Sequence, residues 1–155
     1  MSKEQLDFGG FSLKDILMWK KQAGGVNQIK LRGHNIPVQY TGTVLVADGI
    51  MCDSYSTPGS QVDLAIVTVL PGFNTPLQRV LNGKTTIEQH QSGNGALMVI
   101  RSDDTKRTLI VGPSLSKAME VKVGELMQWT AIGYLKFVEF CDPPYEEGRF
   151  ENIKQ

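Results

Sequence analysis

The sequence of 155 residues is poor in several features that would mark a specialised class of protein. It has only two cysteines, Cys52 and Cys141, which is too few for a disulfide framework, so we expect thiols in a reducing compartment. A bridge between these two cysteines is neither required nor excluded by the sequence. The longest apolar run, Leu64 to Leu70, is broken by Thr68 and is far too short to cross a bilayer.

The charges show no excess of either sign, since 16 basic residues balance 16 acidic ones. Nucleic acids and anionic membranes both attract basic surfaces, so this balance argues against either as a partner. The N-terminal segment lacks the apolar stretch of a secretory signal. We therefore expect a cytoplasmic protein whose partner is a small molecule.

A chain of this length and 41% hydrophobic content is enough for one globular domain. Near its start, Ser12 is a candidate cap for a helix with apolar residues Leu13, Ile16 and Leu17, and Gly24-Gly25 ends it. The division we expect is an N-terminal extension with this helix over residues 1–26, a β-barrel over residues 27–141 and a tail over residues 142–155.

Beyond this helix the pattern is that of β-strands separated by turn residues. Val62, Leu64 and Ile66 alternate as in a half-buried strand, and turns such as Asn82-Gly83 separate the candidate strands. No helical pattern lies between them, which excludes a parallel βαβ sheet and predicts an all-β sandwich or barrel. The expected strands are residues 28–32, 38–40, 43–47, 62–70, 85–91, 96–101, 108–111, 118–123, 126–132 and 134–140.

One segment resembles the first motif of the cupins, in which a glycine precedes His-x-His, a glutamate and a second glycine. Gly72 and Gly93 match the two glycines, and Gln78, Val80 and Thr86 occupy the positions of the histidines and the glutamate. The second motif is similar to residues 123–129, with Gln128 or Met127 at the histidine position, and the ending from Glu139 to Tyr145 also resembles small cupins.

The resemblance implies a cupin-like jelly roll, or double-stranded β-helix barrel, that pairs as a homodimer through strand edges. It implies no metal site, because Gln78, Val80, Thr86 and Gln128 replace the imidazoles and the carboxylate that a cupin metal requires. We therefore expect no metal and no other cofactor.

Glu88 and His90 are the candidate catalytic residues. A strand alternates with period two, so both share a face with Thr86, which the family register turns inward. A carboxylate beside an imidazole stabilises the imidazolium, and such a pair exchanges protons near neutral pH. The alternative is a solvated strand face, and a slip of one residue would turn Thr85, Ile87, Gln89 and Gln91 inward instead.

Gln78, Thr86, Gln128 and Thr130 are the candidate substrate-binding residues. Amide and hydroxyl groups orient a neutral polar ligand if they face the barrel interior, although they can equally bond strand backbone. Two functions stay open: a metal-independent isomerase, epimerase or lyase, and a non-catalytic binding or sensing protein. A third hypothesis, a mere scaffold, predicts a barrel filled with side chains.

Overall fold

The computed structural model describes residues 28–112 and 117–154, and these residues form strands joined by short turns. The predicted N-terminal helix lies outside the described residues. Among the residues described, no helix has the length and apolarity needed to span a membrane. The strands are β1 (Gln28–Leu31), β2 (His34–Pro37), β3 (Gln39–Ala47), β4 (Ile50–Ser56), β5 (Asp63–Val69), β6 (Gln78–Val80), β7 (Thr85–Ser92), β8 (Gly95–Ile100), β9 (Lys106–Val111), β10 (Ala118–Glu120), β11 (Leu126–Ala131), β12 (Leu135–Asp142) and β13 (Phe150–Asn152).

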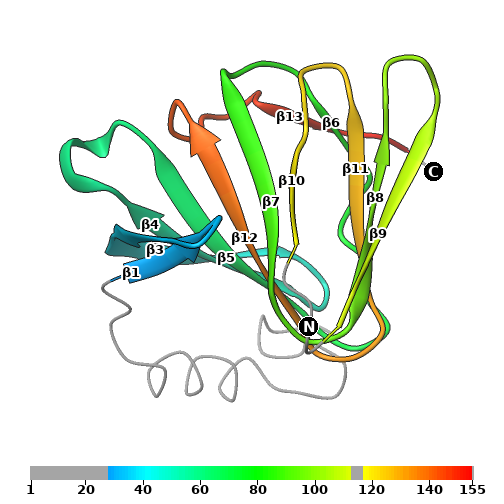
Figure 1. Cartoon of the computed structure of the whole chain (residues 1–155), viewed down its shortest axis with the longest axis horizontal. Coiled ribbons are helices and arrows are strands. Elements are labelled where there is room, and N and C mark those ends of the chain that lie inside the picture. The colour runs from blue at the N-terminus through cyan, green and yellow to red at the C-terminus, as the bar shows by residue number, and fades with distance from the viewer. Residues whose placement is uncertain (1–27, 113–116, 155) are drawn as a thin grey trace, which may run out of the picture.

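These strands form two large antiparallel sheets and a small one. The first sheet has six strands in the order β10-β7-β12-β5-β4-β3, the second has five in the order β13-β6-β11-β8-β9, and β1 pairs with β2 alone. Strands far apart in sequence lie side by side, as β5, β12 and β7 do, which is the connectivity of a jelly roll. Figure 1 shows the two large sheets as facing walls. The all-β jelly-roll expectation is confirmed.

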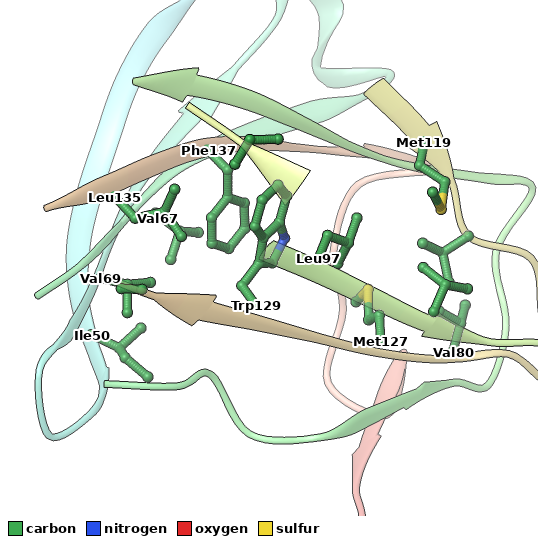
Figure 2. Packing of buried hydrophobic residues seen from close by; sticks show 14 residues of the cluster. Ile50, Val67, Val69, Val80, Leu97, Met119, Met127, Trp129, Leu135 and Phe137 are labelled. Atoms are coloured by element: carbon green, nitrogen blue, oxygen red, sulfur yellow. The ribbon is translucent and has the colours of Figure 1, made fainter. Parts of the chain in front are cut away.

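The space between the two sheets is filled in part by an apolar core. Trp129 of β11 is 1% exposed and stacks on Phe137 of β12, with ring centroids 4.5 Å apart (Figure 2). Leu97 and Met127 pack in the same cluster. All these positions follow from period-two alternation, because every second residue of a strand faces the opposite sheet.

The outer face of the six-stranded sheet is also covered, by the β1–β2 hairpin. Ile29 and Leu31 of the hairpin pack with Ile87 of β7 and Val138 of β12. The side chain of Gln89 in β7 binds the hairpin, because its Oε1 accepts a hydrogen bond from the backbone amide of Arg32 at 2.6 Å. The central strands are therefore buried on both faces, and β7 can turn Thr86, Glu88 and His90 only toward the barrel interior.

Strand β4 was not among the expected strands. Aspartate is depleted in strands, and Asp53, Ser54 and Ser56 together obscure the apolar alternation of the segment. Asp53 is nevertheless buried, and its carboxylate accepts a hydrogen bond from the Thr43 hydroxyl at 2.7 Å. Pairing with β3 and β5 on either side holds the segment extended.

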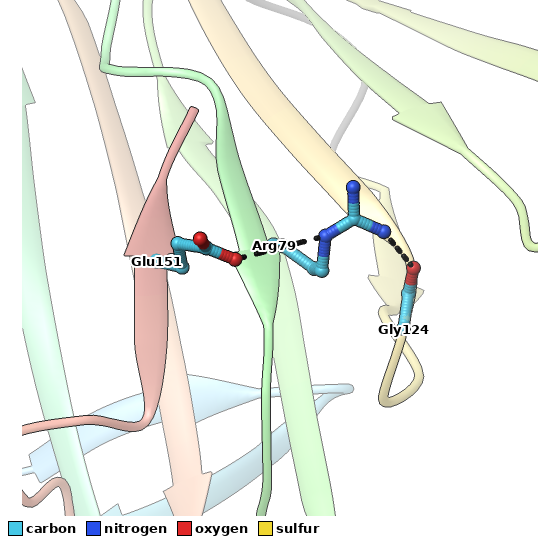
Figure 3. Close-up of polar contacts among 3 residues, drawn as sticks. All are labelled: Arg79, Gly124 and Glu151. Carbon is cyan, nitrogen blue, oxygen red and sulfur yellow. Dashed lines mark hydrogen bonds and ion pairs between the residues drawn. The ribbon is translucent and has the colours of Figure 1, made fainter. Parts of the chain in front are cut away.

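The tail after residue 142 contributes to the barrel through β13, which pairs with β6. Arg79 of β6 lies between two partners in Figure 3: its Nε is 3.9 Å from a carboxylate oxygen of Glu151, and its Nη1 donates to the Gly124 carbonyl at 3.3 Å. Arg79 and Glu151 are both well exposed, so this ion pair adds little stability. The main anchor of the tail is the buried Arg149, described below.

Candidate active site

Beside the apolar core, the barrel interior contains a cavity of about 390 Å³. Its walls come from the inner faces of β3, β4, β5 and β12, the segment before β6, and the tail. A cavity of this size can hold a small organic molecule. The lining residues include Ile50, Cys52, Ser54, Asp63, Ala65, Val67, Gln78, Phe137, Glu139, Cys141, Tyr145 and Phe150.

The inner face of β7 is buried, not solvated. Thr86 is 2% exposed, Glu88 1% and His90 2%. Ile87 and Gln89, the residues that a slipped register would turn inward, contact the hairpin instead. The structure therefore places the predicted catalytic residues inside the barrel wall, in the register that the cupin resemblance implies.

A second glutamate, Glu139 of β12, lies directly opposite Glu88 of β7. Directly opposed residues have Cβ atoms about 4.5–5.5 Å apart, so the two carboxyl groups are neighbours on one face. The indole Nε1 of Trp129 donates to Glu88 Oε1 at 3.1 Å. The other oxygen, Oε2, is buried with no described partner at ordinary hydrogen-bond distance. Glu139 is the member of the pair that lines the cavity.

Both carboxyl groups are biased toward the protonated form. Burial raises the pKa of Glu88 well above its ordinary value, and the charge of Glu139 raises it further. Burial likewise raises the pKa of Glu139, aided by the charge of Asp63 and opposed by its contact with Glu88 and by Arg149. Because two opposed carboxylates in a dry site repel each other, the pair favours a state that shares one proton.

The other ionisable groups of the cavity wall are an aspartate and two thiols. Asp63 Oδ2 accepts a hydrogen bond from the Tyr145 amide at 2.8 Å, and burial raises the pKa of this carboxyl. Burial raises the pKa of Cys52 to about 12, and also raises the pKa of Cys141. Both thiols therefore stay protonated at neutral pH and are poor nucleophiles.

The two cysteines are free, and the register separates them too widely for a bridge. Cys52 is opposite Val67 of β5, whereas Cys141 is opposite Asp63 of the same strand. Two strand spacings of about 4.8 Å and four residues of about 3.4 Å lie between them. A disulfide requires Cα atoms within about 7 Å. The question left open by the sequence is settled against a bridge.

His90 is not part of the cavity wall. Its Nε2 forms a 2.8 Å hydrogen bond with the carbonyl of Gly93, in the turn after β7. This hydrogen bond stabilises the turn between β7 and β8. The ionisable residue that lies opposite Glu88 in the sheet is Glu139, not His90. Sequence reasoning missed this partner because cross-strand neighbours cannot be read from one strand. The available signal was a glutamate in the otherwise apolar alternation of Phe137, Glu139 and Cys141.

Two of the predicted substrate-binding residues lie inside the barrel wall. Gln78 lines the cavity, and its Nε2 donates to Asn152 Oδ1 of β13 at 3.0 Å. The Thr86 hydroxyl accepts a hydrogen bond from an Arg149 Nη2 at 3.0 Å. Gln78 is thus placed to contact a ligand, whereas Thr86 supports the tail.

The expectation that Gln128 and Thr130 line the cavity is wrong. In β11 the inward positions belong to Met127, Trp129 and Ala131, which join the core. Their neighbours must point to the other face. Gln128 donates to the Thr75 carbonyl at 2.9 Å on that outer face, and Thr130 is exposed.

The cupin metal positions do not fit a metal in this chain. Val80 has no donor atom and is buried in the core, and Gln128 points outward. The Thr86 hydroxyl is held by Arg149. Among the residues that the structure describes, no group of three or more histidine, cysteine, aspartate or glutamate side chains could hold a metal ion.

Arg149 is a buried cation of the tail, only 2% exposed, that sequence reasoning missed. Its guanidinium donates to the carbonyls of Pro143 and Thr85, each at 2.8 Å, and to that of Asp142 at 3.3 Å. A Cβ atom at Gly83 would lie 2.5 Å from its Cζ, so glycine there makes room for the guanidinium. This anchor holds Tyr145 and Phe150 against the cavity.

Neither a protein-family model nor a curated protein matches the chain. Solved structures do resemble it. Oxalate decarboxylase of Bacillus subtilis aligns with a TM-score of 0.54 and 22% identity over 66% of this chain and 28% of that chain. The S161A mutant of that enzyme aligns with a TM-score of 0.59 and 18% identity over 81% and 35%.

CapF in complex with 3-isopropenyl-tropolone aligns with a TM-score of 0.59 and 12% identity over 77% of this chain and 35% of that chain. The chain thus spans between 28% and 35% of the length of these proteins. At such low identity the likeness concerns the fold. Because both proteins belong to the cupin superfamily and the sheets have jelly-roll connectivity, this chain has a cupin-type fold.

Proposed function

We propose that the cavity receives a small polar molecule and that Glu139, backed by Glu88, exchanges a proton with it. The observation that supports this is the carboxyl pair at the cavity wall, with Glu139 facing the cavity and Glu88 fixed by Trp129. Raised pKa values of paired acids at a cavity are typical of acid–base sites. The structural neighbours, oxalate decarboxylase and CapF, are enzymes that act on small molecules.

The reaction class is isomerase, epimerase or lyase chemistry that needs no redox partner. As base, the Glu139 carboxylate takes a proton from a carbon next to a carbonyl group, and the electron pair moves onto the carbonyl oxygen. As acid, the same carboxyl returns the proton to the other face or to a neighbouring atom, which completes an isomerisation. Glu88 acts as a positioning residue, because it lies directly opposite Glu139 and its carboxyl contact opposes the rise of the Glu139 pKa.

The proposed reaction is independent of metal, since the family's metal positions are occupied by Gln78, Val80, Thr86 and Gln128. Metal analysis of the purified protein tests this directly. Turnover that survives dialysis against a chelator supports the proposal, and turnover that is lost and restored by one metal contradicts it.

The catalytic proposal is tested on the molecule that the protein itself retains. Mass spectrometry of small molecules released on denaturation identifies it, and wild type, Glu139→Gln and Glu120→Gln are then incubated with it in D₂O. NMR should reveal deuterium incorporation and product with wild type, a loss of about 100-fold or more with Glu139→Gln, and no change with Glu120→Gln, an exposed carboxyl of β10. Full activity of Glu139→Gln would contradict the assignment.

A non-catalytic binding or sensing protein is the second candidate. It is favoured by the largely apolar wall around Ile50, Val67 and Phe137, and by the position of His90 outside the cavity. In that case the retained molecule binds but neither exchanges deuterium nor changes. The open cavity counts against the third hypothesis, a scaffold filled with side chains.

We also keep the homodimer as a proposal. Strand β3 is an edge of the six-stranded sheet, and its Val44 is 57% exposed and Val46 45% exposed. An exposed edge strand offers unpaired backbone groups with which another chain can pair. Light scattering after size exclusion should give about twice the chain mass, and a monomer mass at working concentration would contradict this.

A further inference from the structure

The charges around the cavity are of one sign. The carboxyl groups of Asp63 and Glu139 both line it, and no lysine, arginine or histidine is among its described lining residues. Asp63 is the diagonal neighbour of Glu139 across β5 and β12, since Glu139 is opposite Ala65. Diagonal neighbours have a spacing of about 7–8 Å. A charged ligand group that contacts the Glu139 carboxyl is therefore close enough to be attracted by the Asp63 carboxyl as well.

Arg149 is the cation whose charge acts on Asp63 and Glu139, and its guanidinium is largely engaged by other groups. Its guanidinium is engaged by the carbonyls of Pro143, Thr85 and Asp142 and by the Thr86 hydroxyl. Arg149 is buried and is not among the described lining residues of the cavity. An anionic ligand would thus leave water, meet no cationic side chain among the described lining residues and face two acidic side chains.

We propose that the ligand of this cavity is a small organic cation, an ammonium group attached to an apolar body. The assignment rests on the proposed function and narrows its substrate class. The ammonium group lies at Glu139 and Asp63, and the apolar body packs on Ile50, Val67 and Phe137. A preference for a cation is opposite to what a site for oxalate would need, since the oxalate in the name of oxalate decarboxylase is an anion.

Cation binding is coupled to proton release. The ionisable groups that act on Glu139 are Glu88 and Asp63 from the neighbouring strands and Arg149 from the tail. Without ligand, burial and mutual repulsion keep a proton on the glutamate pair. An arriving ammonium group stabilises the charged carboxylate and displaces that proton. The lining thiols take no part, because burial keeps them protonated.

The test uses three probes that share an apolar ring and differ in charge: 2-phenylethylammonium, 2-phenylethanol and 3-phenylpropanoate. Isothermal titration calorimetry at pH 7 should show the ammonium probe binding about tenfold or more tightly than the alcohol, with the carboxylate weakest. Phosphate and Tris differ in their enthalpy of protonation. The heat of binding of the ammonium probe should therefore differ between the two buffers by the amount that corresponds to about one released proton. Glu139→Gln should remove both the preference and the proton release, and Glu120→Gln should retain both.

The outcomes separate this inference from the proposed function. Alcohol or carboxylate binding as tight as that of the ammonium probe overturns the cationic ligand while leaving a small-molecule cavity in place. A preference that survives in Glu139→Gln, or no binding of any probe, also overturns it. The proposed function fails separately, through a retained molecule that shows no proton exchange or conversion.

Discussion

The barrel interior has two halves that share the same sheets but differ in chemistry. Around Trp129, Leu97 and Met127 most inward side chains are apolar and fill the space, and the buried Glu88 carboxyl accepts a hydrogen bond from the Trp129 indole. Around Glu139 and Asp63 the same alternation places acids at a cavity. Burying an acid costs free energy, so the acidic half is kept at the expense of stability, as functional sites commonly are.

The largest expected effect comes from breaking the apolar half. Trp129→Ala removes the largest fully buried side chain among the described residues and the indole donor to Glu88, and should lower the free energy of unfolding by about 3–5 kcal/mol. Urea denaturation measures it. Trp129→Phe separates the two roles, because it keeps much of the packing but not the N–H group. A loss below about 1 kcal/mol in Trp129→Ala would show that the core does not depend on this residue.

The next effect concerns the tail that closes the acidic half. Arg149→Met removes the donor to the carbonyls of Pro143 and Thr85, whereas the carbonyl of Asp142 keeps its bond from the Lys84 amide, and it should cost about 2–4 kcal/mol. The matched control is Arg79→Met, whose exposed ion pair with Glu151 is worth less than about 1 kcal/mol. Equal losses in the two variants would mean that burial does not distinguish these arginines.

Replacing one member of the carboxyl pair should have a smaller effect, and it should raise the free energy of unfolding instead of lowering it. The folded-state pKa of Glu88 is raised above the unfolded value of 4.5, so the folded protein binds the extra proton and loses stability as pH rises through this window. Glu88→Gln should therefore be more stable than wild type by about 1–2 kcal/mol at pH 7.5, with the difference vanishing near pH 4. Thermal unfolding across this range tests it, and a variant less stable at every pH refutes it.

The smallest effect belongs to the outer face of β11. Gln128→Ala and Thr130→Ala should each change stability by less than about 1 kcal/mol and leave ligand affinity in the cavity unchanged. A tenfold loss of affinity in either variant would place these side chains in the binding site after all.

The sequence predicted the class of fold well because alternation and turn residues are local signals. Period-two alternation also predicted that Thr86, Glu88 and His90 share one face of β7. The register of the sheet places that face inward. Alternation was less informative for β4, because Asp53 and two serines interrupt the apolar pattern of this partly buried strand. There the pairing with two neighbouring strands, not local preference, determines the conformation.

The candidate site depended on information that one sequence does not contain. Glu139 is far from Glu88 in the chain, and only the pairing of β12 with β7 brings them together. The same limit explains the error at Gln128 and Thr130, because the register of β11 decides which residues face inward. Arg149 was missed since an arginine in a polar tail gives no sign of burial.

The central claim is that Glu88 and Glu139 share a proton at neutral pH. The most direct measurement is a ¹³C NMR titration of the glutamate side-chain carboxyl groups in labelled protein, with Glu88→Gln and Glu139→Gln for assignment. We predict a carboxyl signal that titrates well above the ordinary glutamate pKa and moves when either partner is replaced. Titration of every glutamate in its ordinary range would contradict the account.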